Sequence, residues 1–268
     1  MLGFDMHVHT SASDGCYSAE EIVDQAKKIN LEGLAITDHD TVGSLHAAMS
    51  IMKNSGYPII PGIELSAEWE DRDVHILGYW IDFEKNILLD RLEQLQEERR
   101  DRCRTMVGIL DRMGMSLDAE QIIEQGGWAI GRPHVARAMV DAGYTANTRE
   151  AFNQWIGRGM PAYVPRVKFS PFEAMDMVER IGGVSVLAHP GVNVPDGLIA
   201  QLVRRGLGGI EVYHPEHNYQ AERKYLQIAK FYHLAIMGGS DFHGVSGRDL
   251  GSKRTQLMQL EILARYRQ

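Results

Sequence analysis

Seven short apolar segments recur along the chain, and most of them are separated by segments of helical periodicity. Gly, Pro or polar residues bound each one, as is typical of buried strands. They occupy residues 2–6, 33–37, 58–61, 75–81, 183–188, 209–212 and 234–237. Strands that alternate with helices build a parallel sheet, open or closed into a barrel. The length of 268 residues is compatible with one barrel of roughly 250 residues or with two ordinary domains.

Capping boxes, in which a serine is followed three residues later by a glutamate, mark two helix starts. Ser18 with Glu21 predicts a helix that ends near residue 30, and Ser170 with Glu173 predicts one that ends near residue 181. Each of these helices directly precedes a predicted strand, so both fit the alternation of helices and strands.

The segment between the fourth and fifth predicted strands has a different character. A long, charge-rich amphipathic helix is expected first, and shorter helices follow it, at residues 88–113, 133–141 and 149–156. We therefore predict that residues 1–82 and 162–268 form an α/β barrel, and that residues 83–161 form a helical insertion, or cap.

Composition and charge restrict the function. Hydrophobic residues make up 44% of the chain and charged residues 24%, which is the balance of a globular protein with a sizeable core. The formal net charge of −8 argues against a protein that coats nucleic acid, because that task needs a basic surface. A nucleotide can still bind in a locally positive pocket.

The cysteine content and the first residues predict a cytoplasmic protein without a membrane partner. Cys16 and Cys103 are too few for a disulfide framework, which favours a reducing compartment. Residues 1–5 lack the basic and long apolar regions of a signal peptide. No apolar run reaches the ~20 residues that span a bilayer.

Histidines and carboxylates follow the predicted strands at the points where the strands end. His7 and His9 alternate with apolar residues after the first strand, so both side chains point to the same side. Other strand ends carry His39, Glu64, His189, Asp241 and His243. Active sites of parallel α/β proteins are assembled at the carboxyl ends of the strands. We therefore expect these side chains to meet and to hold metal ions.

The types of ligand indicate the chemistry. Imidazoles and carboxylates without thiolates suit manganese, iron or zinc, whereas magnesium and calcium prefer more oxygen ligands. Neighbouring ions can generate hydroxide from water and neutralise a phosphoryl group together with its leaving oxygen. The pattern therefore favours hydrolysis of a phosphate ester.

Several polar residues near these strand ends also have a purely structural interpretation. Asp14 precedes a glycine and by itself is typical of a turn, and His75 at the start of a predicted strand is compatible with a surface histidine. Asp38 and Asp40 are interpreted as helix caps or as supports for ligands, in preference to direct ligands. The histidines on predicted helices are interpreted as structural, and they are His46, His217 and His233.

Six short motifs occur in a fixed order along the chain. They are His7-Val8-His9, Ser13-Asp14-Gly15, Thr37-Asp38-His39-Asp40, Gly62-Ile63-Glu64, Ala188-His189-Pro190 and Gly239-Ser240-Asp241-Phe242-His243. Together they resemble the PHP (polymerase and histidinol phosphatase) superfamily, and the resemblance covers nearly the whole chain. It implies a distorted seven-stranded α/β barrel, (β/α)7, with a trinuclear metal site at its carboxyl rim.

The resemblance also implies a set of nine metal ligands, all of which are filled in this chain. His7, His9, Glu64 and Asp241 would hold the first ion, Glu64 would bridge to a second ion held by His75 and His189, and Asp14, His39 and His243 would hold the third. Glu64 and Asp241 are the predicted catalytic carboxylates. Manganese is the expected metal, with iron and zinc as alternatives. Noncatalytic members often lose several ligands, so the complete set favours an enzyme.

Within the superfamily, the chain is most similar to a short bacterial branch of nucleoside 3′,5′-bisphosphate phosphatases and a 5′-to-3′ exoribonuclease. The shared segments are residues 37–40, Glu64-Leu65-Ser66 with Trp69, and residues 75–78, 131–134 and 157–164. Two features depart from this branch, namely Pro133 in place of a common threonine and a different segment at residues 166–168. The resemblance implies hydrolysis of nucleotide phosphate monoesters, such as nucleoside 3′,5′-bisphosphates or 5′-phosphorylated short RNA.

Two other functions stay open. A histidinol phosphatase or another small-molecule phosphatase would use the same metals and differ in its substrate pocket. A noncatalytic regulatory module would use the metals structurally, although structural zinc sites are usually closed four-ligand sites. A substrate panel would identify the first, and a metal assay combined with a generic phosphate-ester assay would identify the second.

A nucleotide with two phosphates brings more negative charge than the metal ions need to neutralise. Cations outside the metal site should therefore bind the second phosphate. Arg132, Arg158 and Lys168 are the candidates, and Arg132 is preferred because the planar guanidinium matches phosphate oxygens. Ordinary solvated charges are the alternative for the other two. His134 and His214 are further candidates, as hydrogen-bond donors to the substrate or leaving group.

Overall fold

A computed structural model describes residues 3–70, 72–165, 169–245 and 247–267. The chain divides into two compact units, residues 1–89 with 168–268 and residues 90–167. The first unit contains a sheet of seven strands with helices, and the described part of the second unit is helical.

The elements follow one another in the order of their labels. The strands are β1 (Phe4–Asp5), β2 (Gly33–Ile36), β3 (Ile59–Trp69), β4 (Arg72–Tyr79), β5 (Val184–Leu187), β6 (Gly209–Tyr213) and β7 (Ala235–Gly238). The helices of the first unit are α1 (Ala19–Lys28), α2 (Leu45–Ser55), α7 (Pro171–Arg180), α8 (Pro190–Asn193), α9 (Asp196–Arg205), α10 (Tyr219–Phe231) and α11 (Leu257–Ala264). The second unit has α4 (Ala119–Gly126), the 3-10 helix η1 (Gly127–Ala129), α5 (Arg132–Asp141), α6 (Thr148–Ala151) and the π-helix η2 (Phe152–Ile156). Helix α3 (Asn86–Arg112) begins in the first unit and continues into the second.

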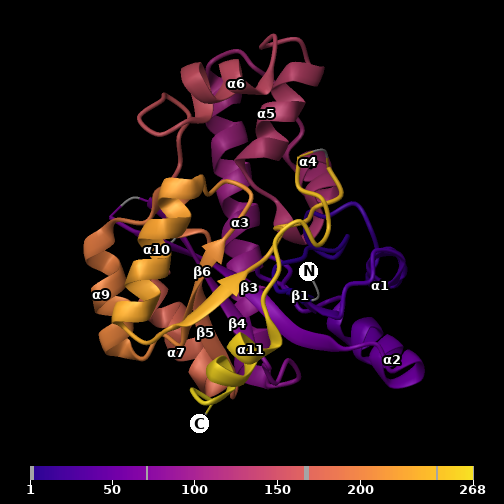
Figure 1. The fold of residues 1–268 in the computed structure, drawn as a ribbon. Helices are drawn as coiled ribbons and strands as arrows, with labels where there is room; N and C mark the ends of the chain where they lie inside the picture. The colour runs from indigo at the N-terminus through magenta and orange to yellow at the C-terminus, as the bar shows by residue number, and fades with distance from the viewer. Residues whose placement is uncertain (1–2, 71, 166–168, 246, 268) are drawn as a thin grey trace. The chain divides into compact units, whose positions relative to one another are not determined.

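The seven strands pair in sequence order and form one sheet. Residues just beyond β1 and β7 bring the two edges together, because Val8 and Phe242 form a parallel bridge. The backbone N–H of His9 also donates to the carbonyl of Phe242 at 2.9 Å. The sheet is therefore nearly closed into a barrel, with α7, α9 and α10 along its outer side (Figure 1). This confirms the expected α/β barrel.

The direction of β4 differs from the all-parallel sheet that the alternation predicted. β4 runs antiparallel to both of its neighbours, β3 and β5. β3 continues to Trp69, beyond the predicted end at residue 61, and Trp69 pairs with Arg72 across a two-residue connection. Such a short connection can join only antiparallel strands, because a parallel crossover needs a dozen or more residues. The prediction was wrong because it ended the third strand at Pro61 and did not include the residues beyond it, which pair with β4 as far as Trp69.

The reversal of β4 places its first half at the rim where the parallel strands end. His75, in the middle of β4, pairs in register with Ser66 of β3 and so lies near Glu64 on the same strand. A parallel β4 would carry residues from its other end to this rim. The antiparallel hairpin is therefore what brings His75 to the histidines that follow the other strands.

The core of the first unit lies between the strands and α11. One buried cluster combines side chains of β2, β3, β4, β5 and β7 with Leu260 and Leu263 of α11. Tyr79 is fully buried in this cluster, and its hydroxyl donates to the carbonyl of Met6 at 2.7 Å. Each fully buried Leu, Ile, Val or Met contributes about 1.5–3 kcal/mol. The core thus supports the strand ends that carry the polar residues.

Both predicted capping boxes are confirmed. The Ser18 side chain accepts a hydrogen bond from the Glu21 backbone, and the Glu21 carboxylate accepts one from the Ser18 backbone at 2.8 Å. Ser170 and Glu173 make the same pair of contacts at the start of α7. Loss of such a cap costs about 1 kcal/mol. The helices that these caps open precede β2 and β5, as the sequence predicted.

The second unit has its own apolar core. Cys103, Met106 and Leu110 of α3 pack in one cluster with Val135 and Met139 of α5. The predicted long helix and the helices near residues 133–141 and 149–156 correspond to α3, α5 and α6 with η2. The assignment of residues 83–161 as a cap domain stays a prediction. In the part of the chain that the structure describes, no helix has both the length and the hydropathy to cross a membrane.

Candidate metal centre

The closure of the barrel positions His7 and His9. Both follow β1, and Val8 between them is fixed by Thr37, whose hydroxyl lies 3.1 Å from the Val8 backbone N–H. With the bridge to Phe242 holding the same stretch from the other edge, both imidazoles point to the same side of the strand and are fully buried. The alternation predicted from sequence thus has its expected geometry.

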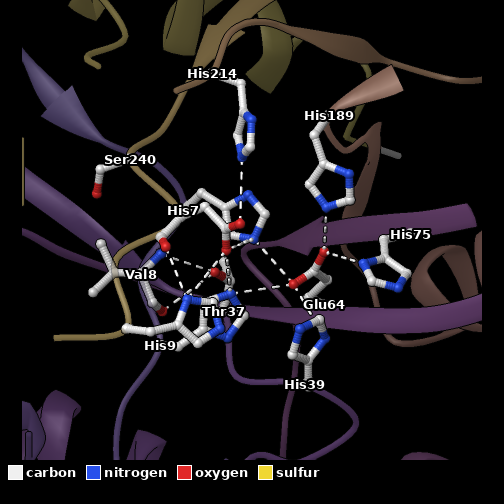
Figure 2. A network of polar contacts seen from close by, with 12 residues as sticks. His7, Val8, His9, Thr37, His39, Glu64, His75, His189, His214 and Ser240 are labelled. Atoms are coloured by element: carbon white, nitrogen blue, oxygen red, sulfur yellow. Dashed lines mark hydrogen bonds and ion pairs between the residues drawn. The ribbon is translucent and has the colours of Figure 1, made fainter. Parts of the chain in front are cut away.

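The Glu64 carboxylate lies at the centre of the cluster, with no exposed surface. Five imidazoles surround it, and their nearest ring nitrogens are 2.8–3.2 Å from its two oxygens. Figure 2 shows these side chains converging on Glu64. His7, His9 and His39 approach Oε2, and His75 and His189 approach Oε1. One carboxylate is therefore shared by two sets of histidines.

Two further carboxylates extend the cluster. Asp241 Oδ1 lies 3.1 Å from His9 Nε2 and 3.4 Å from His7 Nε2. Asp14 Oδ1 lies 3.2 Å from His243 Nε2 and 3.7 Å from His9 Nδ1. Asp14 therefore reaches the cluster and does more than form the turn that its neighbouring glycine suggests.

The potential ligand atoms form three overlapping groups, each within 4.8 Å. The groups are His7, His9, Glu64 and Asp241; His39, Glu64 and His75; and His9, Asp14, His39 and His243. His189 joins the cluster through Glu64. The structure thus brings all nine predicted residues together. His9 and His39 each belong to two groups, whereas the ligand scheme implied by the resemblance assigned each to one ion. Their assignment as metal ligands stays a prediction.

The donor atoms fit divalent metal ions. Nδ1 and Nε2 of His9 and Nδ1 of His39 are buried, and although carboxylate oxygens lie 3.1–3.7 Å away, these nitrogens make no hydrogen bond of good geometry among the described residues. Leaving buried polar atoms unpaired costs about 1–3 kcal/mol each, and a metal ion would remove that cost. Nitrogen and carboxylate donors without thiolate suit manganese, iron or zinc.

Glu64 and His39 have the protonation states that metal binding requires. Burial raises the pKa of Glu64, but the neighbouring imidazoles of His39, His7 and His75 lower it well below its usual value. Burial, together with the charge of His9, lowers the pKa of His39 to about 3 against the influence of Glu64. An ionised carboxylate and a neutral imidazole are the forms that bind metals.

Glu211 is a buried carboxylate of β6 that the sequence interpretation missed. Its Oε1 lies 3.2 Å from His7 Nδ1, and its Oε2 accepts a hydrogen bond from the His189 backbone at 2.8 Å. Since an ionised carboxylate can only accept, Nδ1 of His7 carries the proton. By the same rule Nε2, which faces the carboxylates of Glu64 and Asp241, also carries a proton in the metal-free cluster. A metal ion would displace that proton, while Glu211 would keep the one on Nδ1. The sequence signal that could have identified Glu211 is a single charged residue within a predicted apolar strand.

We expect Glu211→Gln to weaken metal affinity or activity by about 10- to 100-fold, because the variant keeps the volume but loses the charge that fixes the His7 tautomer. Titration of manganese into metal-depleted protein would measure the change. Glu222→Gln is a matched control, since Glu222 pairs with Lys253 rather than with a histidine of the cluster. Equal affinities of the wild-type protein and Glu211→Gln would show that Glu211 does not orient His7.

Asp38 supports the loop that carries Asp14. Its carboxylate accepts hydrogen bonds from the Thr10 backbone at 2.7 Å, the Ser13 hydroxyl at 2.6 Å and the Ser44 hydroxyl at 2.5 Å. These contacts agree with the interpretation of Asp38 as a support. Asp40 Oδ1 likewise accepts from the backbone of Ser66 on β3 at 2.8 Å.

Another buried carboxylate, that of Asp5, fixes the segment after β7. It accepts hydrogen bonds from the Ser240 backbone at 2.9 Å and from the Gly251 backbone at 2.7 Å. Burial raises the pKa of Asp5 to about 6, although these hydrogen bonds oppose the rise. Gly239 precedes this contact, and an added Cβ there would lie 2.3 Å from the Cβ of His7. Only glycine therefore allows the end of β7 to approach His7 so closely.

His214, which the sequence analysis named as a candidate substrate contact, lies in the cluster. Its Nδ1 accepts from the Glu216 backbone at 3.2 Å, so Nε2 carries the proton and faces Asp241 Oδ2 at 3.3 Å. His214 therefore contacts a proposed metal ligand. Its contact with substrate stays a prediction.

The other predicted substrate contacts lie elsewhere in the chain. Arg132 and Arg158 belong to the second unit, where both guanidinium groups pack against Tyr163, at 5.6 and 5.9 Å from the ring centre. His134 Nδ1 accepts from the Gly131 backbone at 3.2 Å. Lys168 lies outside the described residues. All four roles stay predictions.

The histidines interpreted as structural are only partly where they were expected. His46 lies on α2 and is exposed. His217 and His233 lie just outside α10 instead of on predicted helices. The buried ring of His217 donates to the Val212 carbonyl at 2.9 Å and accepts from the Gly191 backbone at 3.0 Å, which supports a structural role.

The chain is similar in sequence to a known protein family and to two characterised proteins. The family described as PHP domain matches residues 5–163. The 5′-3′ exoribonuclease Rnm of Escherichia coli (strain K12) is 33% identical over 249 residues, which cover 90% of this chain and 85% of that protein. The 3′,5′-nucleoside bisphosphate phosphatase of Chromobacterium violaceum is 33% identical over 260 residues, which cover 94% of this chain and 91% of that protein.

A solved structure shares the fold along the whole chain. It is described as a metal-dependent phosphoesterase from Bifidobacterium adolescentis and superposes with a TM-score of 0.85 at 30% identity. The match covers 100% of this chain and 97% of that chain. The similarity therefore includes both compact units.

Proposed function

The chain belongs to the PHP domain family, and from this premise we propose that it hydrolyses phosphate monoesters of nucleotides at the histidine–carboxylate cluster. It is a metal-dependent phosphoesterase, that is, a hydrolase of phosphate esters. The observation that carries the proposal is Glu64, a fully buried carboxylate contacted by five imidazoles. Such a shared carboxylate suits several neighbouring ions better than one closed structural site.

We propose three ion positions, with manganese preferred and iron or zinc as alternatives. His7, His9, Glu64 and Asp241 would hold the first ion, Glu64, His75 and His189 the second, and Asp14, His39 and His243 the third. When bound, the ions would supply the Lewis acidity that activates water and offsets the charge of a phosphoryl group. The overlap of the groups at His9 and His39 supports ions that are close neighbours.

The protein's own residues prepare this site. Glu211 holds the proton of His7 on the nitrogen that faces away from Glu64. His214 donates to the outer oxygen of Asp241 and so orients the carboxylate. The imidazoles around Glu64 and Asp241 lower the pKa of both carboxyl groups, despite burial, and keep them ionised at neutral pH. The site is therefore preorganised for positively charged ligands.

The substrate class follows from the two curated relatives, which are named as acting on 3′,5′-nucleoside bisphosphates and as a 5′-3′ exoribonuclease. We propose nucleoside 3′,5′-bisphosphates as substrates of this chain, and 5′-phosphorylated short RNA as a further substrate. Manganese-loaded protein should be assayed against a nucleoside 3′,5′-bisphosphate, a 5′-phosphorylated short RNA and histidinol phosphate. Preferred turnover of histidinol phosphate would contradict the nucleotide assignment, and no turnover of any ester would contradict the proposed function.

Arg132 is proposed to bind the phosphate that does not react. We expect Arg132→Ala to reduce turnover of a nucleoside 3′,5′-bisphosphate about 10- to 100-fold and to affect a small aryl phosphate much less, because remote binding energy positions the reacting centre. Parallel measurements of kcat/KM on the two substrates would test this. Arg137→Ala, an exposed position on the same helix, is the matched control. Equal losses on both substrates would place Arg132 at the reacting phosphate or in the fold.

A further inference from the structure

Arg248 contacts the cluster from the loop after β7, and the sequence interpretation did not single it out. It donates hydrogen bonds to Asp241 Oδ2 through Nη1 and to Glu216 Oε1 through Nη2. We infer that Arg248 binds the phosphoryl oxygens of the reacting phosphate. This role differs from that of Arg132, which was proposed for the remote phosphate. The inference rests on the proposed function.

The two oxygens of Asp241 face different partners. Oδ1 lies 3.1 Å from His9 Nε2 and 3.4 Å from His7 Nε2, and both histidines belong with Asp241 to one group of potential ligands. Oδ2 is the oxygen that Arg248 and His214 contact. Arg248 therefore leaves Oδ1 available for a metal ion. A phosphoryl group drawn to a metal ion at this ligand group would meet a guanidinium that contacts the other oxygen of the same carboxylate.

Exposure increases along the chain of contacts that leads out of the cluster. The side chain of Asp241 is 7% exposed, that of Arg248 is 28% exposed and that of Glu216 is 45% exposed. Arg248 thus lies between the buried carboxylate and solvent. An entering phosphate can meet the guanidinium before it reaches the histidines.

The guanidinium has the donors for this task. Two of its five N–H groups point to carboxylates in the described part of the chain, which fixes the plane of the group and leaves further donors for an anion. If Asp241 shares its charge with a divalent ion, Glu216 is the remaining counter-charge of Arg248. A planar guanidinium held in this way matches two oxygens of a phosphate.

The decisive measurement is the affinity of manganese-loaded protein for inorganic phosphate, determined by calorimetric titration. We expect Arg248→Ala to weaken phosphate binding about 10- to 100-fold and to change manganese affinity less than about twofold. Arg248→Lys should retain part of the phosphate affinity because it keeps the charge but loses the fork. The lysine variant also keeps the test valid if the alanine variant fails to fold.

Two matched variants separate binding from general charge effects. Arg205→Ala removes an arginine that pairs with Asp176 and Glu179, outside the cluster, and should leave phosphate affinity unchanged. Glu216→Gln removes the outer counter-charge and keeps Arg248, so phosphate affinity should stay constant or increase. Weakened phosphate binding in Glu216→Gln would contradict the inference, because it would show that the contact between Glu216 and Arg248 does not compete with phosphate.

The outcomes distinguish the inference from the proposed function. Unchanged phosphate affinity together with reduced manganese affinity in Arg248→Ala would mean that Arg248 only positions Asp241, and it would overturn the inference. A wild-type protein that does not bind phosphate would overturn it as well. A wild-type protein that binds phosphate through Arg248 but hydrolyses no phosphate ester would instead overturn the proposed function.

Discussion

Glu64→Ala is expected to reduce phosphate-ester hydrolysis by about 10³-fold or more. Glu64 is contacted by five imidazoles through both of its oxygens, so its removal takes away the one carboxylate that two proposed ion positions share. Phosphate release from an aryl phosphate would measure the loss, and the metal content of the purified protein should fall with it.

The fold should survive this substitution. Glu64 lies on β3, whose long ladder with β4 depends on backbone pairing rather than on the carboxylate. Circular dichroism and a thermal melt would verify that the variant is folded, and Glu64→Gln would keep the side-chain volume. Glu179→Ala, at a surface site paired with Arg205, is the control for loss of a glutamate. Full manganese-dependent turnover in folded Glu64→Ala protein would contradict the assignment of Glu64 as the bridging ligand.

Removal of the metal ions with a chelator is expected to abolish hydrolysis and to lower the thermal stability. The three ligand groups combine residues from distant parts of the chain, such as Asp14, His39 and His243, so an ion that joins them stabilises the folded state only. Binding at a metal concentration 100 times the Kd adds about 2.7 kcal/mol to the free energy of unfolding. Readdition of manganese should restore both activity and melting temperature. A melting temperature that does not change when manganese is added would contradict the proposed site.

The apparent metal affinity should rise with pH. Burial lowers the pKa of His9, but Asp241 and Glu64 raise it to about 10, above the ordinary value of 6.5. Protonated His9 therefore stabilises the metal-free folded protein, fully so below pH 6.5. This contribution disappears as the pH rises toward 10. A metal ion must displace that proton, so manganese should bind more tightly at pH 8.5 than at pH 6.5. A pH-independent affinity would exclude His9 as a ligand.

Local sequence patterns identified most of the elements. Ser18 and Ser170 open their helices as predicted because a capping box involves residues only three positions apart. The strand ends were recognisable because a buried strand is a short apolar run. The carboxyl rim could then be inferred, since parallel strands present their ends to one edge of a sheet. The nine predicted ligands do lie together, although their metals remain proposals.

What only the tertiary structure decided depends on contacts between distant residues. The direction of β4, and with it the access of His75 to Glu64, follows from a hairpin in which β3 continues past its predicted end to Trp69. Glu211 is 204 residues away from His7 in the sequence. Arg248 contacts Asp241 because the loop after β7 folds back toward the cluster. A charged residue has no periodic signal of its own, because its role is set by the partner that folding places beside it. The sequence by itself therefore determined the elements and the rim, whereas the three-dimensional structure determined which side chains share each carboxylate.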